Sequence, residues 1–263
     1  MPRVVALYRY PVKGFTPEAC DSLTVLDEGR VAGDRVLGFR FANSSAAPDV
    51  WSTKHEFVAL VNTPGLARLH LRFDHKTLKL CITIDGEMLV NDALDAIGRR
   101  KIAAAIENYL IGLDDNVLAA HPERLPLQLV GDGIAPRYQD NAAGQITLHG
   151  RASLAAVGAA VGDDCLSERR FRSNIVIDGI DAWEEQSWVG RAIQIGRVKF
   201  DVVIPKTRCL ATQANPDSGQ RDLPILKTLT HAFNQEKPTF AVGMLTRGPG
   251  GEIFVGDEVS LVD

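Results

Sequence analysis

The chain has 263 residues, of which 45% are apolar, and its formal net charge is −4 at pH 7. This apolar content is enough for one or two hydrophobic cores, and the acidic balance argues against a dedicated nucleic-acid-binding protein, which would carry a basic patch or stripe. The start of the chain has no signal-peptide pattern, and no apolar run approaches the ~18 residues of a membrane span. We therefore expect a cytoplasmic protein that neither enters a membrane nor binds nucleic acid.

The four cysteines lie far apart in the sequence, at Cys20, Cys81, Cys165 and Cys209. No CxxC pair occurs, so the spacing does not indicate a structural zinc site or a cysteine-bound iron–sulfur cluster. In a cytoplasmic protein these side chains are expected to be free thiols.

Alternating apolar and polar residues predict strands in the first third of the chain, over residues 4–8, 35–41, 67–73 and 77–84. The last of these runs ends in Asp85-Gly86, which is a strong hairpin turn. A helix is expected over residues 92–110, followed by a connection rich in Asp, Gly and Pro.

The later part of the chain returns to strands after a short predicted helix over residues 152–161. Further strands are predicted over residues 174–177, 192–196, 198–204, 239–245 and 252–261, with a helix over 226–233. Many short strands with Gly and Pro turns favour a small barrel or sandwich. We see no alternating βαβ pattern, which disfavours a Rossmann domain.

The sharpest local feature is Cys209, which comes just after two cations, Lys206 and Arg208. The preceding strand is expected to stop at Pro205. Neighbouring cations favour the thiolate form of a cysteine, which attacks electrophiles and binds soft metals. The alternative is that Cys209 is a small buried apolar side chain, and its immediate neighbours leave both interpretations open.

Other cations lie at the ends of predicted strands. Lys13, next to Gly14, could offer an ammonium group and a backbone N–H to a phosphate, and Arg35 could bind an anion through its planar guanidinium. Arg170 and Arg172 share one face of an extended segment, where their charges would repel unless an anion or carboxylates lay between them. The alternatives are ordinary surface cations in the first case and pairing with the acidic run over residues 181–185 in the second.

Together, these segments resemble the MOSC family, named after the C-terminal domain of molybdenum cofactor sulfurase. Residues 10–13 and 33–35 look like the β-barrel domain that precedes MOSC in the mitochondrial amidoxime-reducing proteins and their bacterial relatives. The MOSC core is resembled, in order, by residues 170–175, 187–190, 207–209, 215–219 and 255–259.

The resemblance implies a β-rich α+β fold. An N-terminal β-barrel-like domain, residues 1–115, would pack on a C-terminal MOSC β-barrel, residues 116–263, with a few helices.

The resemblance also implies a site for the molybdenum cofactor, that is, molybdenum bound to molybdopterin. Cys209 would be both the molybdenum ligand and the catalytic residue. The residues implied to bind the cofactor are Lys13, Gly14, Arg35, Asp140, Asn141, Arg170, Arg172, Thr207 and Arg208. The sequence departs from the family pattern at Gly14, where many relatives have serine, and at Ser173, where proline is usual.

The implied activity is that of an oxidoreductase that reduces small N-hydroxylated compounds such as amidoximes and hydroxylamines. Because the chain shows no cluster-binding cysteines, electrons are expected from a separate protein, ferredoxin-like or a reductase. Two alternatives stay open. In one, a Cys209 persulfide carries sulfur for metal–sulfur cluster assembly; in the other, the protein is a non-catalytic carrier of the molybdenum cofactor.

Overall fold

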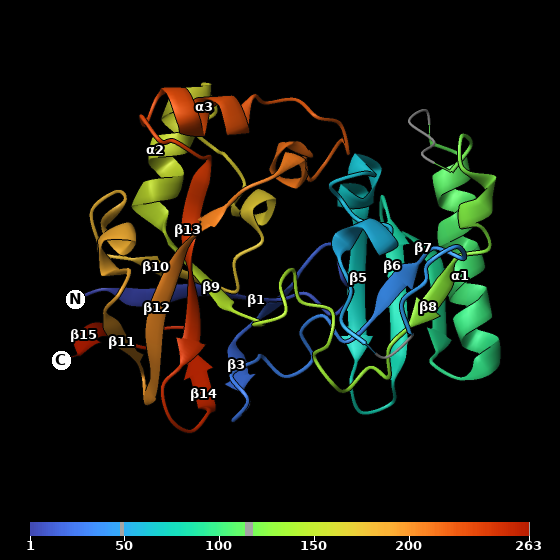
Figure 1. Ribbon diagram of the computed structural model, residues 1–263, viewed down its shortest axis with the longest axis horizontal. Helices are drawn as coiled ribbons and strands as arrows, with labels where there is room; N and C mark the ends of the chain where they lie inside the picture. The colour runs from blue at the N-terminus through green and yellow to red at the C-terminus, as the bar shows by residue number, and fades with distance from the viewer. Residues whose placement is uncertain (48–49, 114–117, 263) are drawn as a thin grey trace.

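The computed structural model describes residues 1–47, 50–113 and 118–262, and it shows two units side by side (Figure 1). One unit is built on a large sheet with helices α2 (Arg151–Val161) and α3 (Ile225–His231) near one end. The other is built on a three-stranded sheet flanked by helix α1 (Ala96–Ile111). Across the described ranges there are three α-helices and fifteen strands, so the predicted β-rich class with a few helices is confirmed.

The large sheet has eight strands and is mostly antiparallel. Its order is β15 (Val259–Val262), β11 (Ala192–Ile195), β12 (Val198–Thr207), β13 (Thr239–Thr246), β9 (Ile146–Gly150), β10 (Ile175–Asp178), β1 (Arg3–Arg9) and β2 (Glu18–Cys20). Near its two ends the sheet curls together, because the Val4 N–H donates to the Asp257 carbonyl and the Val259 N–H donates to the Pro2 carbonyl. These bonds join the ends at one isolated bridge, Arg3 to Glu258, so the described strands do not form the continuous ladder of a closed barrel.

Strands β9 and β10 are the one parallel pair of this sheet within the described part of the chain, and helix α2 connects them. Parallel neighbours need such a crossover, so this segment is a βαβ unit, which the sequence pattern did not reveal. Gly162 ends α2 with a φ of 75°, a left-handed conformation that glycine adopts without steric cost. The single unit leaves the rest of the sheet antiparallel.

The three-stranded sheet consists of β5 (Leu69–Asp74), β6 (Lys79–Ile84) and β7 (Glu87–Ala93). The predicted hairpin turn between β6 and β7 is present, with φ of 52° at Asp85 and 83° at Gly86.

Helix α1 begins four residues later than predicted, because the Asp95 carboxylate accepts the N–H groups of Ile97 and Gly98 and thereby caps the helix there.

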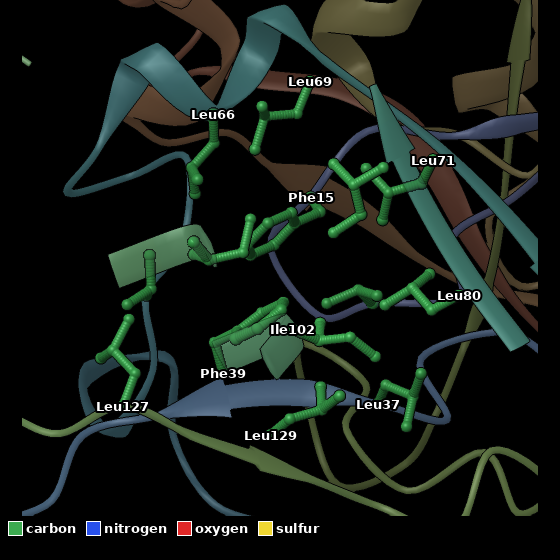
Figure 2. Close-up of a cluster of buried hydrophobic side chains, with 14 of the residues drawn as sticks. Phe15, Leu37, Phe39, Leu66, Leu69, Leu71, Leu80, Ile102, Leu127 and Leu129 are labelled. Atoms are coloured by element: carbon green, nitrogen blue, oxygen red, sulfur yellow. The ribbon is translucent and has the colours of Figure 1, made fainter. Parts of the chain in front are cut away.

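A second small pair, β4 (Gly38–Arg40) with β8 (Gln128–Val130), completes the apolar centre of this unit. Figure 2 shows this centre, where Phe15, Phe39, Leu71 and Ile102 converge from a loop, β4, β5 and α1. The rings of Phe15 and Phe39 stack with centroids 4.9 Å apart. Val12 and Phe15 both belong to this core, so the core anchors the two residues between them, Lys13 and Gly14, which line the site described below.

The predicted boundary between residues 115 and 116 lies outside the described residues, and the division into two domains stays a prediction. The first strands of the chain pack with the last ones: β1 pairs with β10, and β3 (Ser22–Val25) pairs with β14 (Gly251–Phe254). The chain therefore runs from the large sheet through the second unit and back to the large sheet.

Three other expected elements differ from the sequence prediction. The strand expected over 35–41 is confined to β4, because Arg35 adopts a left-handed conformation, with φ of 52°, and turns the chain. Strand β12 continues past Pro205 to Thr207, with a register shift between these residues, the kind of irregularity at which a strand tolerates proline. The single strand expected over 252–261 is two strands, β14 and β15, separated by a turn.

Candidate functional site

A pocket of about 430 Å³ lies between the two units, with lining residues from each. This is the size range of a small-molecule or cofactor site. All ten residues that the sequence analysis assigned to a site line this one pocket: Lys13, Gly14, Arg35, Asp140, Asn141, Arg170, Arg172, Thr207, Arg208 and Cys209. The fold thus brings together residues almost 200 positions apart, while their individual roles stay predictions.

Positive charge dominates the lining of the pocket. Its cationic side chains are Lys13, Arg35, Lys54, Arg170, Arg172, Lys206 and Arg208, and Asp140 is the one carboxylate among the lining residues. A concave surface with this imbalance attracts an anion.

Arg35 and Arg172 lie at the same part of the pocket, because each guanidinium carbon is 4.5 Å from the centre of the Tyr10 ring. Both residues have left-handed backbones, with φ of 52° and 55°. Asp34 pairs with the Arg35 guanidinium, and the Phe15 carbonyl accepts a hydrogen bond from Arg172 Nη1.

The second terminal nitrogen of Arg172, Nη2, is buried and has no hydrogen-bond partner among the described residues. Burial, followed by the nearby charge of Arg35, lowers the pKa of Arg172. An anionic ligand would pair this nitrogen and relieve the repulsion between the two guanidinium groups.

Lys13 is held almost completely out of solvent, with 1% of its surface exposed. Its ammonium donates to the backbone carbonyls of Tyr138 and Gln139, both at 3.0 Å, and lies 4.0 Å from Asp140 Oδ1. Burial is the largest influence and lowers the pKa of Lys13 to about 8, although Asp140 opposes the shift. Burying this charge is therefore costly, and a bound anion would offset the cost.

Gly14, next to this lysine, has a φ of 75°, and a Cβ at this position would lie 2.5 Å from the Ala59 Cβ. A serine, which the family pattern favours at this position, therefore does not fit between the two segments as they stand. The departure from the family pattern is explained by the close approach of Ala59.

The other departure, Ser173, is buried, and its hydroxyl oxygen has no hydrogen-bond partner within the described ranges. Its backbone carbonyl accepts a hydrogen bond from the Tyr10 hydroxyl at 3.1 Å.

Asp140 and Asn141 form the side of the pocket that faces Lys206. The Asp140 side chain is 62% exposed, and desolvation within the pocket raises its pKa, but the charges of Arg35 and Lys13 outweigh that effect and hold the pKa below its ordinary range. Gln145 Oε1 accepts hydrogen bonds from Asn141 Nδ2 at 2.8 Å and from Lys206 Nζ at 2.9 Å. Asp140 is therefore ionised at neutral pH, and Asn141 helps to orient Lys206 through Gln145.

Cys209 is a half-buried free thiol that precedes the short 3-10 helix η6 (Leu210–Gln213). Its carbonyl accepts hydrogen bonds from the N–H and the hydroxyl of Thr212, both at 3.0 Å. The neighbouring Arg208 donates through Nη2 to the Phe171 carbonyl, and its buried Nε has no partner in the part of the chain that the structure describes. The thiol thus lies beside a cation with unused hydrogen-bonding capacity.

Arg170 also lines the pocket, but both terminal nitrogens of its guanidinium bind other protein groups, while its buried Nε has no partner among the described residues. Nη1 and Nη2 donate to the two carboxylate oxygens of Asp222 at 2.9 and 2.8 Å, and Nη1 also donates to the Gln213 carbonyl at 3.2 Å. Its charge is therefore compensated by Asp222 rather than left for an anion, unlike that of Arg172.

Sequence reasoning did not assign the other lining residues to the site. Lys206 was singled out only as a cation near Cys209, and Gln139 directly precedes the assigned Asp140, so their position next to assigned residues is the signal that points to them. Residues 51–55 carry no motif, and only the fold shows that this segment forms a wall; the Trp51 ring N–H donates to the Gln139 carbonyl at 2.9 Å and ties the segment to the pocket.

The described residues contain no group of three or more His, Cys, Asp or Glu side chains placed to hold a metal ion, so Cys209 does not belong to such a cluster. Separately, none of the described helices combines the length and the apolar character needed to cross a membrane.

Comparisons with known proteins identify a domain in the second half of the chain and relatives that match parts of it. Residues 136–260 match the family model of the MOSC domain. Human mitochondrial amidoxime-reducing component 1 is 34% identical over 102 residues, which cover 35% of this chain and 29% of that protein. A molybdenum cofactor sulfurase of Caenorhabditis elegans is 34% identical over 73 residues, which cover 28% of this chain and 10% of that protein. The matches thus span less than a third of the length of these relatives.

Among solved structures, the YuaD protein from Bacillus subtilis is similar over 98% of this chain and 94% of its own, at 10% identity and a TM-score of 0.43. From the family-model match we conclude that residues 136–260, slightly less than half of the chain, are a MOSC domain.

Proposed function

We propose that the protein is a molybdenum-cofactor-dependent oxidoreductase that reduces small N-hydroxylated compounds, such as amidoximes and hydroxylamines, with electrons from a separate protein. The observation that carries this proposal is the single pocket in which the thiol of Cys209 lies among cations contributed by both units. The names of the amidoxime-reducing relatives support the substrate class. We extend the proposal to a cytoplasmic location.

The side chains of the pocket fit the anionic cofactor that this proposal requires. Arg172 Nη2 and Arg208 Nε are buried donors without partners within the described ranges, and they suit the oxygen and sulfur atoms of an anion. Gln139 Oε1 is a buried acceptor that also has no partner within the described ranges, and it suits an N–H of a heterocycle. Cys209 offers the sulfur ligand that soft metals favour.

When bound, the molybdenum cofactor would supply two-electron oxygen-atom chemistry. The residues of this chain would bind and orient it: Lys13, Arg35 and Arg172 would hold its anionic end, and Thr207 and Arg208 would flank the thiol. Asp140 stays ionised, so it would accept hydrogen bonds rather than donate a proton. Because the pocket is walled by both units, a bound cofactor would be shielded from bulk water on two sides.

Elemental analysis of protein purified from a host that makes the cofactor tests this function. We expect molybdenum in the wild-type protein and in Cys165→Ala, which removes an exposed thiol. We expect molybdenum at background level in Cys209→Ala, and hydroxylamine reduction with an artificial electron donor to be lost with it. Equal molybdenum in the wild type and Cys209→Ala would contradict the proposal.

A second candidate is sulfur transfer through a persulfide of Cys209, which the similarity to molybdenum cofactor sulfurases favours. Little molybdenum together with cyanide-releasable sulfur that disappears in Cys209→Ala would select it. A non-catalytic cofactor carrier would instead contain molybdenum but show no turnover with any artificial donor.

A further inference from the structure

We propose that Arg170 and Asp222 are positioning residues that fix the segment 208–213, and with it the thiol of Cys209, against the 3-10 helix η4 (Glu168–Phe171). This inference rests on the proposed function only for the importance of Cys209. It assigns Arg170 a role other than the direct cofactor contact that the family resemblance implies. Arg170 precedes this segment in the sequence and Asp222 follows it, and their side chains bind each other in the fold.

The first step is the attachment of the far end of the segment. Gln213 is the last residue of η6, and its carbonyl accepts from Arg170 Nη1 at 3.2 Å. The same guanidinium binds both oxygens of the Asp222 carboxylate, at 2.9 and 2.8 Å, and the Arg170 side chain is only 3% exposed. A bidentate, charge-assisted pair of this kind is directional as well as attractive, so it fixes orientation.

The second step is the attachment of the near end of the segment to the same helix. The Arg208 Nη2 donates to the carbonyl of Phe171, the residue after Arg170. The Arg208 N–H also donates to the Pro238 carbonyl at 2.7 Å. The residues on either side of Cys209 are therefore held to η4, with the thiol-bearing residue between them.

The third step is the rigidity of the loop that carries Asp222. Asn215 Nδ2 donates to Asp222 Oδ2 at 2.6 Å, and the Asp222 N–H donates to the Gln213 carbonyl at 3.3 Å. The Asn215 side chain also accepts from the N–H groups of Asp217 and Ser218. The loop closes on itself at its base, so Asp222 cannot shift without moving Gln213 and the end of η6.

The alkylation rate of Cys209 in cofactor-free protein tests this assignment directly. Full-length protein from a host that cannot make the cofactor would be treated with iodoacetamide, and each cysteine followed by peptide mass spectrometry. Asp222→Asn keeps the shape of the side chain but removes its charge, and we expect Cys209 to react roughly tenfold faster, because a charge-assisted bond that restrains local opening is weakened. Cys165 is exposed in the wild type and serves as the internal reference.

Asp201→Asn is the matched control. The Asp201 carboxylate is also bound by an arginine, with Arg247 Nε at 2.8 Å and Nη2 at 2.6 Å, but it lies on β12 away from the pocket lining. We expect this variant to leave the Cys209 rate unchanged. Asp222→Glu keeps the carboxylate, and we expect it to restore a slow Cys209 rate, which a general loss of packing would not produce.

An unchanged Cys209 rate in Asp222→Asn would overturn the proposal, and so would an equal rise at the half-buried Cys20 and Cys81, which would indicate general loosening. If Asp222→Asn does not fold, Arg170→Lys gives the same test, because lysine keeps the charge but cannot bind both carboxylate oxygens in parallel. A wild-type protein without molybdenum would refute the proposed function and leave this result standing.

Discussion

The N-terminal wall of the pocket, formed by residues 13–14 and Arg35, is held mainly by the backbone around it. In the C-terminal wall, residues 206–212, strand β12 ends at Thr207, and the part beyond it is tied to η4 by the side chains of Arg170 and Arg208. Lys13 binds two backbone carbonyls, and Gly14 is pressed against Ala59. The C-terminal wall depends on Arg170 and on Asp222 beyond it. We infer that substitutions in the N-terminal wall change the stability of the fold, while substitutions around the C-terminal wall change the reactivity of the Cys209 thiol.

The largest stability effect is expected at Gly14. Gly14→Ser forces a side chain into a left-handed backbone and against Ala59, so we expect a loss of about 3 kcal/mol in the free energy of unfolding. Gly86→Ser is the control, because Gly86 has a similar φ of 83° but nothing within 4 Å of its Cβ position. It should cost only about 1 kcal/mol. If urea unfolding shows equal losses of stability for Gly14→Ser and Gly86→Ser, the close approach of Ala59 does not add to the cost at Gly14.

The second effect concerns the pH dependence set by Lys13. Its pKa is lowered from 10.5 to about 8, so the unfolded state binds the proton more tightly than the folded state does. The stability of the protein without bound anions should therefore rise between about pH 8 and pH 10.5. The gain is at most about 3 kcal/mol.

Lys13→Met removes this titrating group, so its unfolding free energy should lack the rise above pH 8, whatever its constant offset. Urea unfolding of both proteins across this pH range measures the difference. Parallel pH profiles for the wild type and Lys13→Met would show that burial does not lower the pKa of Lys13.

The smallest effect is expected at Asp222, on the side that holds the C-terminal wall. Burial raises its pKa, but hydrogen bonds from Arg170 and Asn215 outweigh that effect and lower the pKa below its ordinary value. Its stabilising contribution is thus present above the unfolded pKa near 3.9 and is lost as pH falls through the folded pKa.

Because the carboxylate is 32% exposed, we expect Asp222→Asn to reduce stability at pH 7 by only about 1 kcal/mol, with the difference shrinking in acid. Thermal unfolding from pH 7 downward checks this. A difference that stays constant into acid would mean that ionisation of Asp222 does not hold the wall.

Much of the site could be predicted from the sequence, because each of its segments carries a local signature. The cations beside Cys209, the lysine beside a glycine, and the paired arginines were visible in short windows, and the order of the segments indicated one site. Partners that meet only in the fold were not predictable: Asp222 lies 52 residues from Arg170, and neither belongs to a strand or α-helix with a periodic pattern.

The same reasoning applies to the fold. The hairpin between β6 and β7 was readable from the sequence, since turn chemistry and alternation are local. The crossover through α2 and the pairing of β1 with β10 are set by burial in a common core, so no short window reveals them. The continuation of β12 past Pro205 likewise depends on its neighbour β13.

Strand β1 lies in the large sheet between β10 and β2, although the matched domain begins only at residue 136. A fragment cut to that domain would lack Val4 and Leu7, both part of the apolar core of the sheet, and would leave the backbone of β10 open along one side. Open strand edges template aggregation, and pairing across some 170 positions is slow because a long loop must close first. Strand β1 must therefore wait for strand β10, in the second half of the chain, before the sheet can be completed, so the folding of the two units is coupled.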